Sequence, residues 1–135
     1  MNIAKIMIPK SLTVFLHENN TVRQGLESLS SHSYTAIPVL DGNGRYIGSI
    51  TEGDFLRCII ELGTTAKREL ENRRISDILR QDFCPALPID AEEDVVIDAV
   101  LKQNFVPIVD ARNMLCGIVT RRRLIAYLAG RELSL

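Results

Sequence analysis

The fold is decided by residues 34–56, YTAIPVLDGNGRYIGSITEGDFL. Two short apolar runs, residues 36–40 and 46–50, flank the sequence Asp-Gly-Asn-Gly. Both dipeptides of this tetrapeptide favour the positive φ angles of a tight hairpin turn. Helical spacing of apolar residues begins after Thr51. The stretch therefore predicts a strand, a hairpin turn, a second strand and the start of a helix.

The same pattern occurs a second time, in residues 103–125. A gap-free alignment of the two stretches superimposes four pairs of identical residues: Pro38 and Pro107, Asp41 and Asp110, Gly48 and Gly117, Thr51 and Thr120. The apolar positions align as well. The chain is therefore two copies of one unit.

The flanking segments complete each copy. Helical spacing predicts helices over residues 22–31 and 91–102, and residues 3–8 read as a short strand or turn that leads into an extended segment, residues 10–16. Each copy thus reads β-α-β-β-α, with residues 1–63 as the first repeat, residues 64–74 as a polar helical connector and residues 75–135 as the second. One repeat of about 60 residues covers its sheet poorly. We expect an α/β (α+β) fold in which the two repeats pack through their sheets into one pseudo-twofold module.

The helix that follows each hairpin carries an apolar stripe. The first stripe is expected to end at Gly63, a C-cap candidate. The expected members are Phe55, Leu56, Ile59 and Ile60 in the first repeat, and Leu124, Ile125, Leu128 and Ala129 in the second.

Composition excludes several classes of protein. Of the 135 residues, 46% are apolar and 24% are charged, which is typical of a folded globular domain. No apolar run approaches the roughly 18 residues of a membrane span, and the N-terminal residues lack the pattern of a secretory signal. We expect a cytoplasmic protein without membrane contact. The net charge of −1 argues against general nucleic-acid binding, so any anion site must be local.

Cysteine and histidine give no sign of a metal site. Cys58, Cys84 and Cys116 are widely separated, and no Cys-x-x-Cys pair occurs. His17 and His32 have no partner at ligand spacing. Buried thiols and the absence of a metal are therefore expected.

Thr51 and Asp54 lie at the junction between the second strand and the helix. One interpretation is a capping box, in which the Thr51 hydroxyl accepts from the Asp54 amide and the carboxylate reaches back. The other is that both residues face a cleft, where a carboxylate can accept the hydroxyls of a ribose. Gly53 between them costs helix stability and would allow close approach to the backbone.

The second copy has Arg121, Arg122 and Arg123 at the corresponding place, so that Arg123 aligns with Asp54. Three arginines in the first turn oppose the positive end of the helix dipole. They indicate either a phosphate bound by helix N–H groups and guanidinium groups, or a basic patch that faces solvent or a partner.

Pro38 and Pro107 lack an N–H group and so belong at a strand start or edge. They indicate either simple strand punctuation or free neighbouring backbone groups that could bind a flat base. No glycine-rich phosphate loop, Cys/His cluster or nucleophile with a paired base is found, so we do not expect an enzyme.

The two aligned stretches resemble CBS domains, and the pair resembles a Bateman module that fills the chain. The sequence of residues 34–41 and the Thr-Arg-Arg run are also similar to the sequences of small free-standing cyclic-di-AMP-binding CBS proteins of Gram-positive bacteria. The resemblance implies an adenosyl ligand (AMP, ADP, ATP, S-adenosylmethionine or cyclic di-AMP) in the cleft between the repeats.

The resemblance also implies site residues. At the first site Thr51 and Asp54 would hold ribose and phosphate, and the base would be enclosed by Thr35, Ala36 and Pro38 together with Ile8, Pro9 and Ser11. The matching residues of the second site are Asn104, Phe105, Pro107 and Thr120, with the segment 83–86. Arg123 replaces the aspartate of the family there. This leaves two alternatives: an empty second site, or arginines that contact the phosphates of a ligand held by the first copy.

We therefore expect a non-catalytic sensor that binds an adenine nucleotide and alters a separate effector protein, and the resemblance implies a homodimer. The first alternative is an interaction scaffold with a vestigial nucleotide site. The second is nucleic-acid binding through the arginine run and Arg112, against which the net charge argues.

Overall fold

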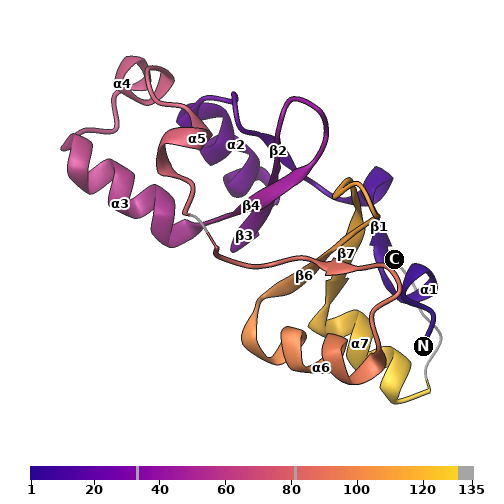
Figure 1. Cartoon of the computed structure of the whole chain (residues 1–135). Coiled ribbons are helices and arrows are strands. Elements are labelled where there is room, and N and C mark those ends of the chain that lie inside the picture. Colours follow the sequence, from indigo (N-terminus) through magenta and orange to yellow (C-terminus); the bar gives the residue numbers. More distant parts are fainter. Residues whose placement is uncertain (33, 81, 131–135) are drawn as a thin grey trace. The chain divides into compact units, whose positions relative to one another are not determined.

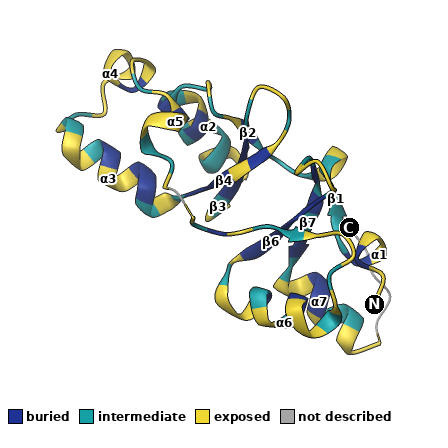
Figure 2. Cartoon of the chain, in the orientation of Figure 1, coloured by how far each residue is buried: buried dark blue, intermediate teal, exposed yellow. Residues whose placement is uncertain are grey.

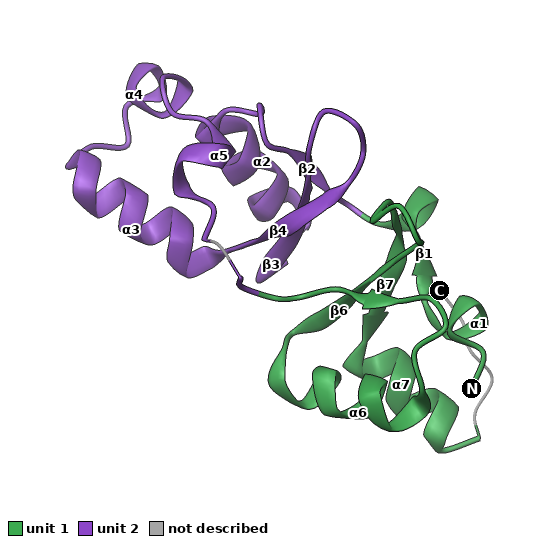
Figure 3. Cartoon of the chain, in the orientation of Figure 1, with its two compact units in different colours: residues 1–13, 84–135 green, residues 14–83 purple. Residues whose placement is uncertain are grey.

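The computed structural model describes residues 1–32, 34–80 and 82–130 (Figure 1). The chain divides into two compact units, coloured separately in Figure 3. Unit 2 is Val14–Phe83, and unit 1 combines Met1–Thr13 with Cys84–Leu135. The last five residues of the predicted second repeat lie outside the described residues. Because unit 1 includes Met1–Thr13, the N-terminal segment of the first sequence repeat belongs to the compact unit that contains most of the second repeat.

Unit 2 holds a three-stranded sheet of order β2-β3-β4, in which β2 and β3 are parallel and β3 and β4 antiparallel. Its elements in chain order are β2 (Leu16–His17), α2 (Val22–His32), β3 (Ala36–Leu40), β4 (Tyr46–Thr51), α3 (Glu52–Leu62), α4 (Lys67–Glu71) and α5 (Ile75–Ile78).

Unit 1 holds a four-stranded sheet of order β1-β7-β6-β5, with β5 and β6 parallel and the other pairs antiparallel. Its elements are α1 (Ile3–Ile6), β1 (Ile8–Pro9), the 3₁₀ helix η1 (Lys10–Leu12), β5 (Leu87–Pro88), α6 (Glu93–Lys102), β6 (Phe105–Val109), β7 (Leu115–Thr120) and α7 (Arg121–Leu128).

The predicted strand, turn, strand and helix are present in both units, with matching strand register and matching hydrogen bonds at the turn. Pro38 faces Ser49 across the first hairpin, and Pro107 faces Ile118 across the second. At each turn an aspartate side chain accepts two backbone N–H groups, Asp41 from residues 43 and 45 and Asp110 from residues 112 and 114. These hydrogen bonds hold the pKa of both carboxyl groups below the usual range, because they favour the charged form.

Each unit has its own apolar core between sheet and helices (Figure 2). In unit 2, Phe55 of α3 and Ile75 of α5 are buried with the inward residues of β3 and β4. In unit 1, Val96 of α6 and Leu124 of α7 are buried with Ile3 and Ile6 of α1. Burial of each such side chain contributes about 1.5–3 kcal/mol, so these faces determine how each helix lies on its sheet.

The apolar stripe predicted for α3 and α7 is only partly buried. Phe55 and Leu124 are buried, but the side chains of Leu56, Ile60 and Ile125 are 58%, 68% and 65% exposed, respectively. Leu56 and Ile60 are four residues apart and form a second row, next to a row made of the buried Phe55 and Cys58 and the partly buried Ile59. Apolar spacing alone cannot distinguish one wide stripe from two adjacent rows. Gly63 ends α3 with φ 68°, as predicted.

Three other segments differ from the expectation. Residues 3–8 begin with the helix α1 because Ile3 and Ile6, three residues apart, are both buried in unit 1. The expected extended segment at residues 10–16 contains η1. The polar connector forms α4, whose Leu70 is buried in the core of unit 2. Among residues 1–32, 34–80 and 82–130, none of the helices combines the length and the apolar character that a bilayer span requires.

The N-terminal segment is tied to unit 1 by backbone pairing and by one arginine. Ile8 and Pro9 of β1 pair with Ile118 and Gly117 of β7. Arg123 of α7 is 8% exposed, and its guanidinium donates from Nε to the carbonyl of Ile6 at 2.8 Å and from Nη2 to the carbonyl of Lys5 at 3.4 Å. These carbonyls belong to the last turn of α1, where a helix leaves acceptors without intrahelical donors.

The close approach of β1 to β7 requires glycine at position 117. A Cβ atom there would lie 2.3 Å from the Ile8 carbonyl oxygen, a backbone atom that cannot rotate away. We expect Gly117→Ala to lower the free energy of unfolding by about 1–3 kcal/mol, measured by urea denaturation. Gly42→Ala is the matched control, because no atom lies within 4 Å of a Cβ built at that turn position. Equal stabilities of the two variants would contradict the packing described here.

Loss of the arginine should release the N-terminal segment. We expect Arg123→Ala to destabilise the fold by about 1–3 kcal/mol, because the buried carbonyl of Ile6 and the partly buried carbonyl of Lys5 lose a charged donor. Hydrogen exchange followed by mass spectrometry should then show faster exchange in the peptide spanning α1 and β1. Arg122→Ala removes the same charge at an exposed neighbouring position and should leave this exchange unchanged. Unaltered protection in Arg123→Ala would show that the guanidinium does not hold the segment.

Candidate functional site

The junction between β4 and α3 carries the predicted capping box. Thr51 is the N-cap residue, and its hydroxyl accepts from the Asp54 amide at 3.3 Å. The Asp54 carboxylate reaches back, so that its Oδ2 accepts from the Thr51 amide at 2.8 Å and from the Thr51 hydroxyl at 3.0 Å. The first interpretation of this motif is therefore correct. It does not exclude a site, because the carboxylate has a second oxygen.

That second oxygen is bound by two arginines. Arg57 donates from Nη2 to Asp54 Oδ1 at 2.6 Å, and the Nε atom of Arg80 forms an ion pair with the same oxygen at 2.7 Å. The Asp54 side chain is only 1% exposed, whereas the Arg57 and Arg80 side chains are 57% and 44% exposed. The guanidinium of Arg80 also lies over the ring of Phe83, with its Cζ atom 3.9 Å from the ring centroid. A buried carboxylate is thus compensated by two cations that reach the surface.

Sequence reasoning missed both arginines. Arg57 follows Asp54 by three residues on the same helix, a spacing that brings side chains together and could have been noticed. Arg80 follows α5, and no local pattern connects it to Asp54. Only the tertiary packing of α5 against α3 brings it to the carboxylate.

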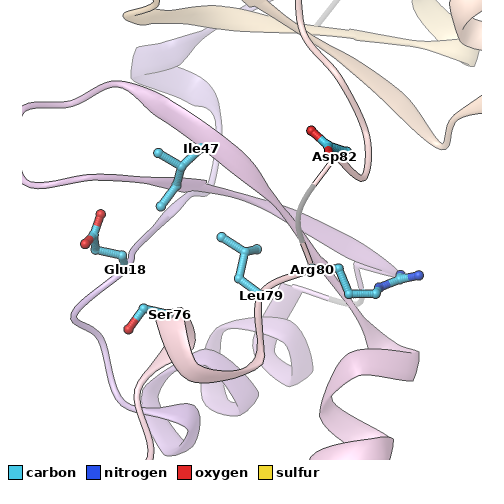
Figure 4. A pocket seen from close by; sticks show the side chains of 6 residues that line it. All are labelled: Glu18, Ile47, Ser76, Leu79, Arg80 and Asp82. Carbon is cyan, nitrogen blue, oxygen red and sulfur yellow. The ribbon is translucent and has the colours of Figure 1, made fainter.

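Two cavities in unit 2 adjoin this cluster. The smaller cavity has a volume of about 190 Å³ and is lined by Asp54, Arg57 and Arg80 together with Cys58, Glu61, Arg73, Asp77 and Ile78. The larger cavity has a volume of about 400 Å³ and is lined by Glu18, Ile47, Ser76, Leu79, Arg80 and Asp82 (Figure 4). In Figure 4 the Arg80 side chain points away from Glu18 and Ser76. Arg80 lines both cavities. The volume of the larger cavity is within the range of small-molecule sites, about 300–1,000 Å³.

The start of β3 brings the residues predicted around the base next to Thr51. Ala36 pairs with Thr51 across the ladder, and the carbonyl of Thr35 accepts from the Glu52 amide at 3.1 Å. β2 pairs only with Val39 and Leu40. In the part of the chain that the structure describes, the stretch from Ala36 to Pro38 therefore has a neighbouring strand on one side only. Pro38 lies inside β3 rather than at its first residue. It pairs with Ser49 of β4 on one side, and no strand lies on its other side in the described part of the chain, so it occupies an edge position where a proline is tolerated.

The second copy has the same strand-to-helix junction with a different charge. Thr120 is again the N-cap residue and accepts from the Arg123 amide at 3.2 Å, and Phe105 pairs with Thr120 across the ladder. Arg121 donates from Nε to the carbonyl of Val100 at 3.0 Å, whereas Arg122 is exposed. Because Arg121 and Arg123 donate to carbonyls of different elements, their guanidinium groups do not converge here. The predicted phosphate role of this run remains a prediction.

The segment predicted to complete the first site, residues 8–11, lies in unit 1, and of the segment predicted for the second site, residues 83–86, only Phe83 lies in unit 2. Ile8 and Pro9 pair with β7 in unit 1, the unit of Thr120, and Ser11 lies in η1 of the same unit. Phe83 lies in unit 2 and contacts Arg80.

The rest of the segment 83–86 belongs to unit 1. Cys84 has φ 60°, and its thiol donates to the carbonyl of Phe105. The side-chain amide of Gln103, the residue before Asn104, donates to the carbonyl of Pro85 at 3.2 Å. Within unit 2 the structure therefore brings together Thr35, Ala36, Pro38, Thr51 and Asp54, and not Ile8, Pro9 and Ser11.

The thiols are buried or half-buried. Desolvation raises the pKa of Cys58 and of Cys116, so both stay protonated at neutral pH. Among the described residues, no group of three or more His, Cys, Asp or Glu side chains is placed to hold a metal ion.

Comparison with known proteins gives one consistent result. The sequence profile of the CBS domain matches residues 3–61 and 75–130. A CBS domain-containing protein of Dictyostelium discoideum is 26% identical over 137 residues, which cover 93% of this chain and 90% of that protein. Three other curated relatives are longer proteins, of which the chain spans only 21–22%.

Solved structures agree with the sequence match. The CbpB protein of Listeria monocytogenes, solved in complex with c-di-AMP, has a TM-score of 0.83 and 25% identity, with 96% of each chain covered. CBSX2, solved in complex with AMP, has a TM-score of 0.77 and 21% identity, with 96% of each chain covered. Two matched repeats, two copies of the strand-hairpin-helix unit and the agreement with these structures lead to one conclusion: the chain belongs to the CBS domain family and carries a pair of CBS repeats.

Proposed function

We propose that this protein is a non-catalytic regulatory module that binds an adenine nucleotide at the β4–α3 junction of unit 2. The observation that carries the proposal is the buried carboxylate of Asp54, placed beside Thr51 and the start of β3. A carboxylate in this position can accept ribose hydroxyls. Backbone groups near Ala36 are suited to the edge of a base.

The comparisons support the ligand class without naming the ligand. CbpB of Listeria monocytogenes binds c-di-AMP, and CBSX2, which has the same fold, binds AMP. AMP, ADP, ATP and cyclic di-AMP share the adenosine group that the Asp54 site would recognise. The 400 Å³ cavity beside Arg80 adds room for a ligand of this size.

Regulation would follow from differential affinity. If the nucleotide binds one arrangement of the module more tightly than another, occupancy shifts the population and changes what a partner contacts. The partner would be a separate effector protein in the cytoplasm. An interaction scaffold with a vestigial nucleotide site is the alternative, and the experiment below separates the two.

We expect AMP, ADP, ATP or cyclic di-AMP to raise the melting temperature of the wild-type protein in a thermal-shift screen that also includes S-adenosylmethionine and NAD. At 100 times the dissociation constant a ligand stabilises the fold by about 2.7 kcal/mol. Asp54→Asn should reduce the affinity at least tenfold, because a charged acceptor is lost. It should also lower the stability of the free protein by about 1 kcal/mol, because the capping box is weakened.

The control for this variant is Glu52→Gln, which neutralises an exposed carboxylate in the same first turn of α3. It should leave the affinity unchanged. No response of the wild-type protein to any of these compounds would refute nucleotide sensing and favour the scaffold.

We further propose that the protein is a homodimer. The exposed apolar side chains on α3 and α7 are the supporting observation, with Leu56, Ile60, Ile125 and Leu128 each more than half exposed. Large apolar side chains in this number on two helices are typical of a protein contact surface.

Analytical ultracentrifugation can test the dimer. We expect Leu56→Glu combined with Ile60→Glu to raise the dimer dissociation constant by about tenfold or more, since each buried apolar side chain contributes about 1.5–3 kcal/mol. Leu12→Glu changes an equally exposed leucine in η1 and should leave the dimer intact. A monomeric wild-type protein, or the same effect in Leu12→Glu, would overturn the proposed interface.

A further inference from the structure

In this structure four groups engage the Asp54 carboxylate, three by hydrogen bonds and one as an ion pair. Its Oδ2 accepts from the amide and the hydroxyl of Thr51, its Oδ1 accepts from Arg57 at 2.6 Å, and the same Oδ1 forms an ion pair with Arg80 at 2.7 Å. Two oxygens offer about four lone-pair positions. Because these four groups leave only 1% of the Asp54 side chain exposed, a ribose hydroxyl can reach the carboxylate only if one of them moves.

The donors differ in how easily they can leave. Both groups of Thr51 are fixed by the capping box. Arg57 lies on α3 itself, in the turn that follows Asp54. Arg80 lies beyond the last residue of α5, and its side chain is 44% exposed and lines both the 190 Å³ and the 400 Å³ cavity. Arg80 is thus the donor with space to move on either side.

A displaced Arg80 stays close to whatever has displaced it. Its chain position is fixed by α5, and Phe83 supports the flat face of its guanidinium. Arginine pairs with phosphate through two parallel hydrogen bonds. A ligand that carries both a ribose hydroxyl and a phosphate can therefore take Asp54 from Arg80 and supply a new anionic partner for Arg80. A neutral nucleoside takes the carboxylate and leaves the guanidinium without a partner.

We propose that Arg80 makes this site selective for phosphorylated ligands by competing with the ribose for Asp54 and pairing with the phosphate after displacement. The inference rests on the proposed nucleotide site and names the property of the ligand that the site reads. Selectivity then comes from a penalty on the nucleoside as well as from a contact with the nucleotide.

The two effects have opposite signs in an Arg80→Ala variant, and this makes them measurable. Isothermal titration calorimetry would compare adenosine, AMP and cyclic di-AMP as probes of the wild-type protein and of the variant. We expect the affinity for the phosphorylated probe that the wild-type protein binds to fall about tenfold or more, because a charge-assisted contact is lost. The affinity for adenosine should rise, because no guanidinium has to be displaced. Arg80→Lys keeps the charge but not the two-pronged geometry, so its affinities for these probes should lie between those of the wild-type protein and of Arg80→Ala.

Arg68→Ala is the matched control, since it removes an exposed arginine from α4 in the same unit. It should change neither affinity. Loss of nucleotide binding in Arg80→Ala without a gain of adenosine binding would overturn the proposal and assign Arg80 a structural role only. If the wild-type protein binds neither AMP nor cyclic di-AMP, the nucleotide site itself fails, and the role of Arg80 fails with it. The two failures are distinguished by the wild-type titration.

Discussion

The buried carboxylate of Asp54 is the constraint on which this account depends. It caps the first turn of α3 by accepting from the Thr51 amide at the end of β4. It also links α3, through an ion pair with Arg80, to the segment that follows α5. A charged group with 1% of its side chain exposed is stable only if its hydrogen bonds are satisfied. The same satisfaction that stabilises unit 2 makes this carboxylate a site that a ligand can enter only by exchange.

The second repeat meets the same constraint with the opposite charge. Arg123 replaces Asp54, and its guanidinium donates to the carbonyls of Lys5 and Ile6. One junction is thus compensated by two surface arginines and the other by the backbone of the N-terminal segment. The repeats share a fold, but they offer different chemistry to a ligand.

Local patterns were sufficient to predict most of the fold. The Asp-Gly-Asn-Gly turn and the capping box at Thr51 depend on residues close together in the sequence, and aligning Pro38 with Pro107 extends the same local pattern to the second copy; each of these features is present in the structure. Leu56 and Ile60 were predicted to share one apolar stripe with Phe55 and Ile59, but both are exposed, because apolar spacing does not show which residues of a stripe face the core. The contacts of Asp54 with Arg80 and of Arg123 with Ile6, and the pairing of β1 with β7, are long-range contacts that no sequence window contains.

The most direct test of the central claim is nuclear magnetic resonance of the Nε–H group of Arg80, whose nitrogen lies 2.7 Å from Asp54 Oδ1 in the free protein. On titration with AMP or cyclic di-AMP, the Arg80 Nε–H signal and the Thr51 amide signal should shift together and saturate at the same ligand concentration. This result would show that the ligand takes the carboxylate and displaces the arginine. A ligand that binds while both signals stay in place would contradict the account, because binding would then occur without Asp54.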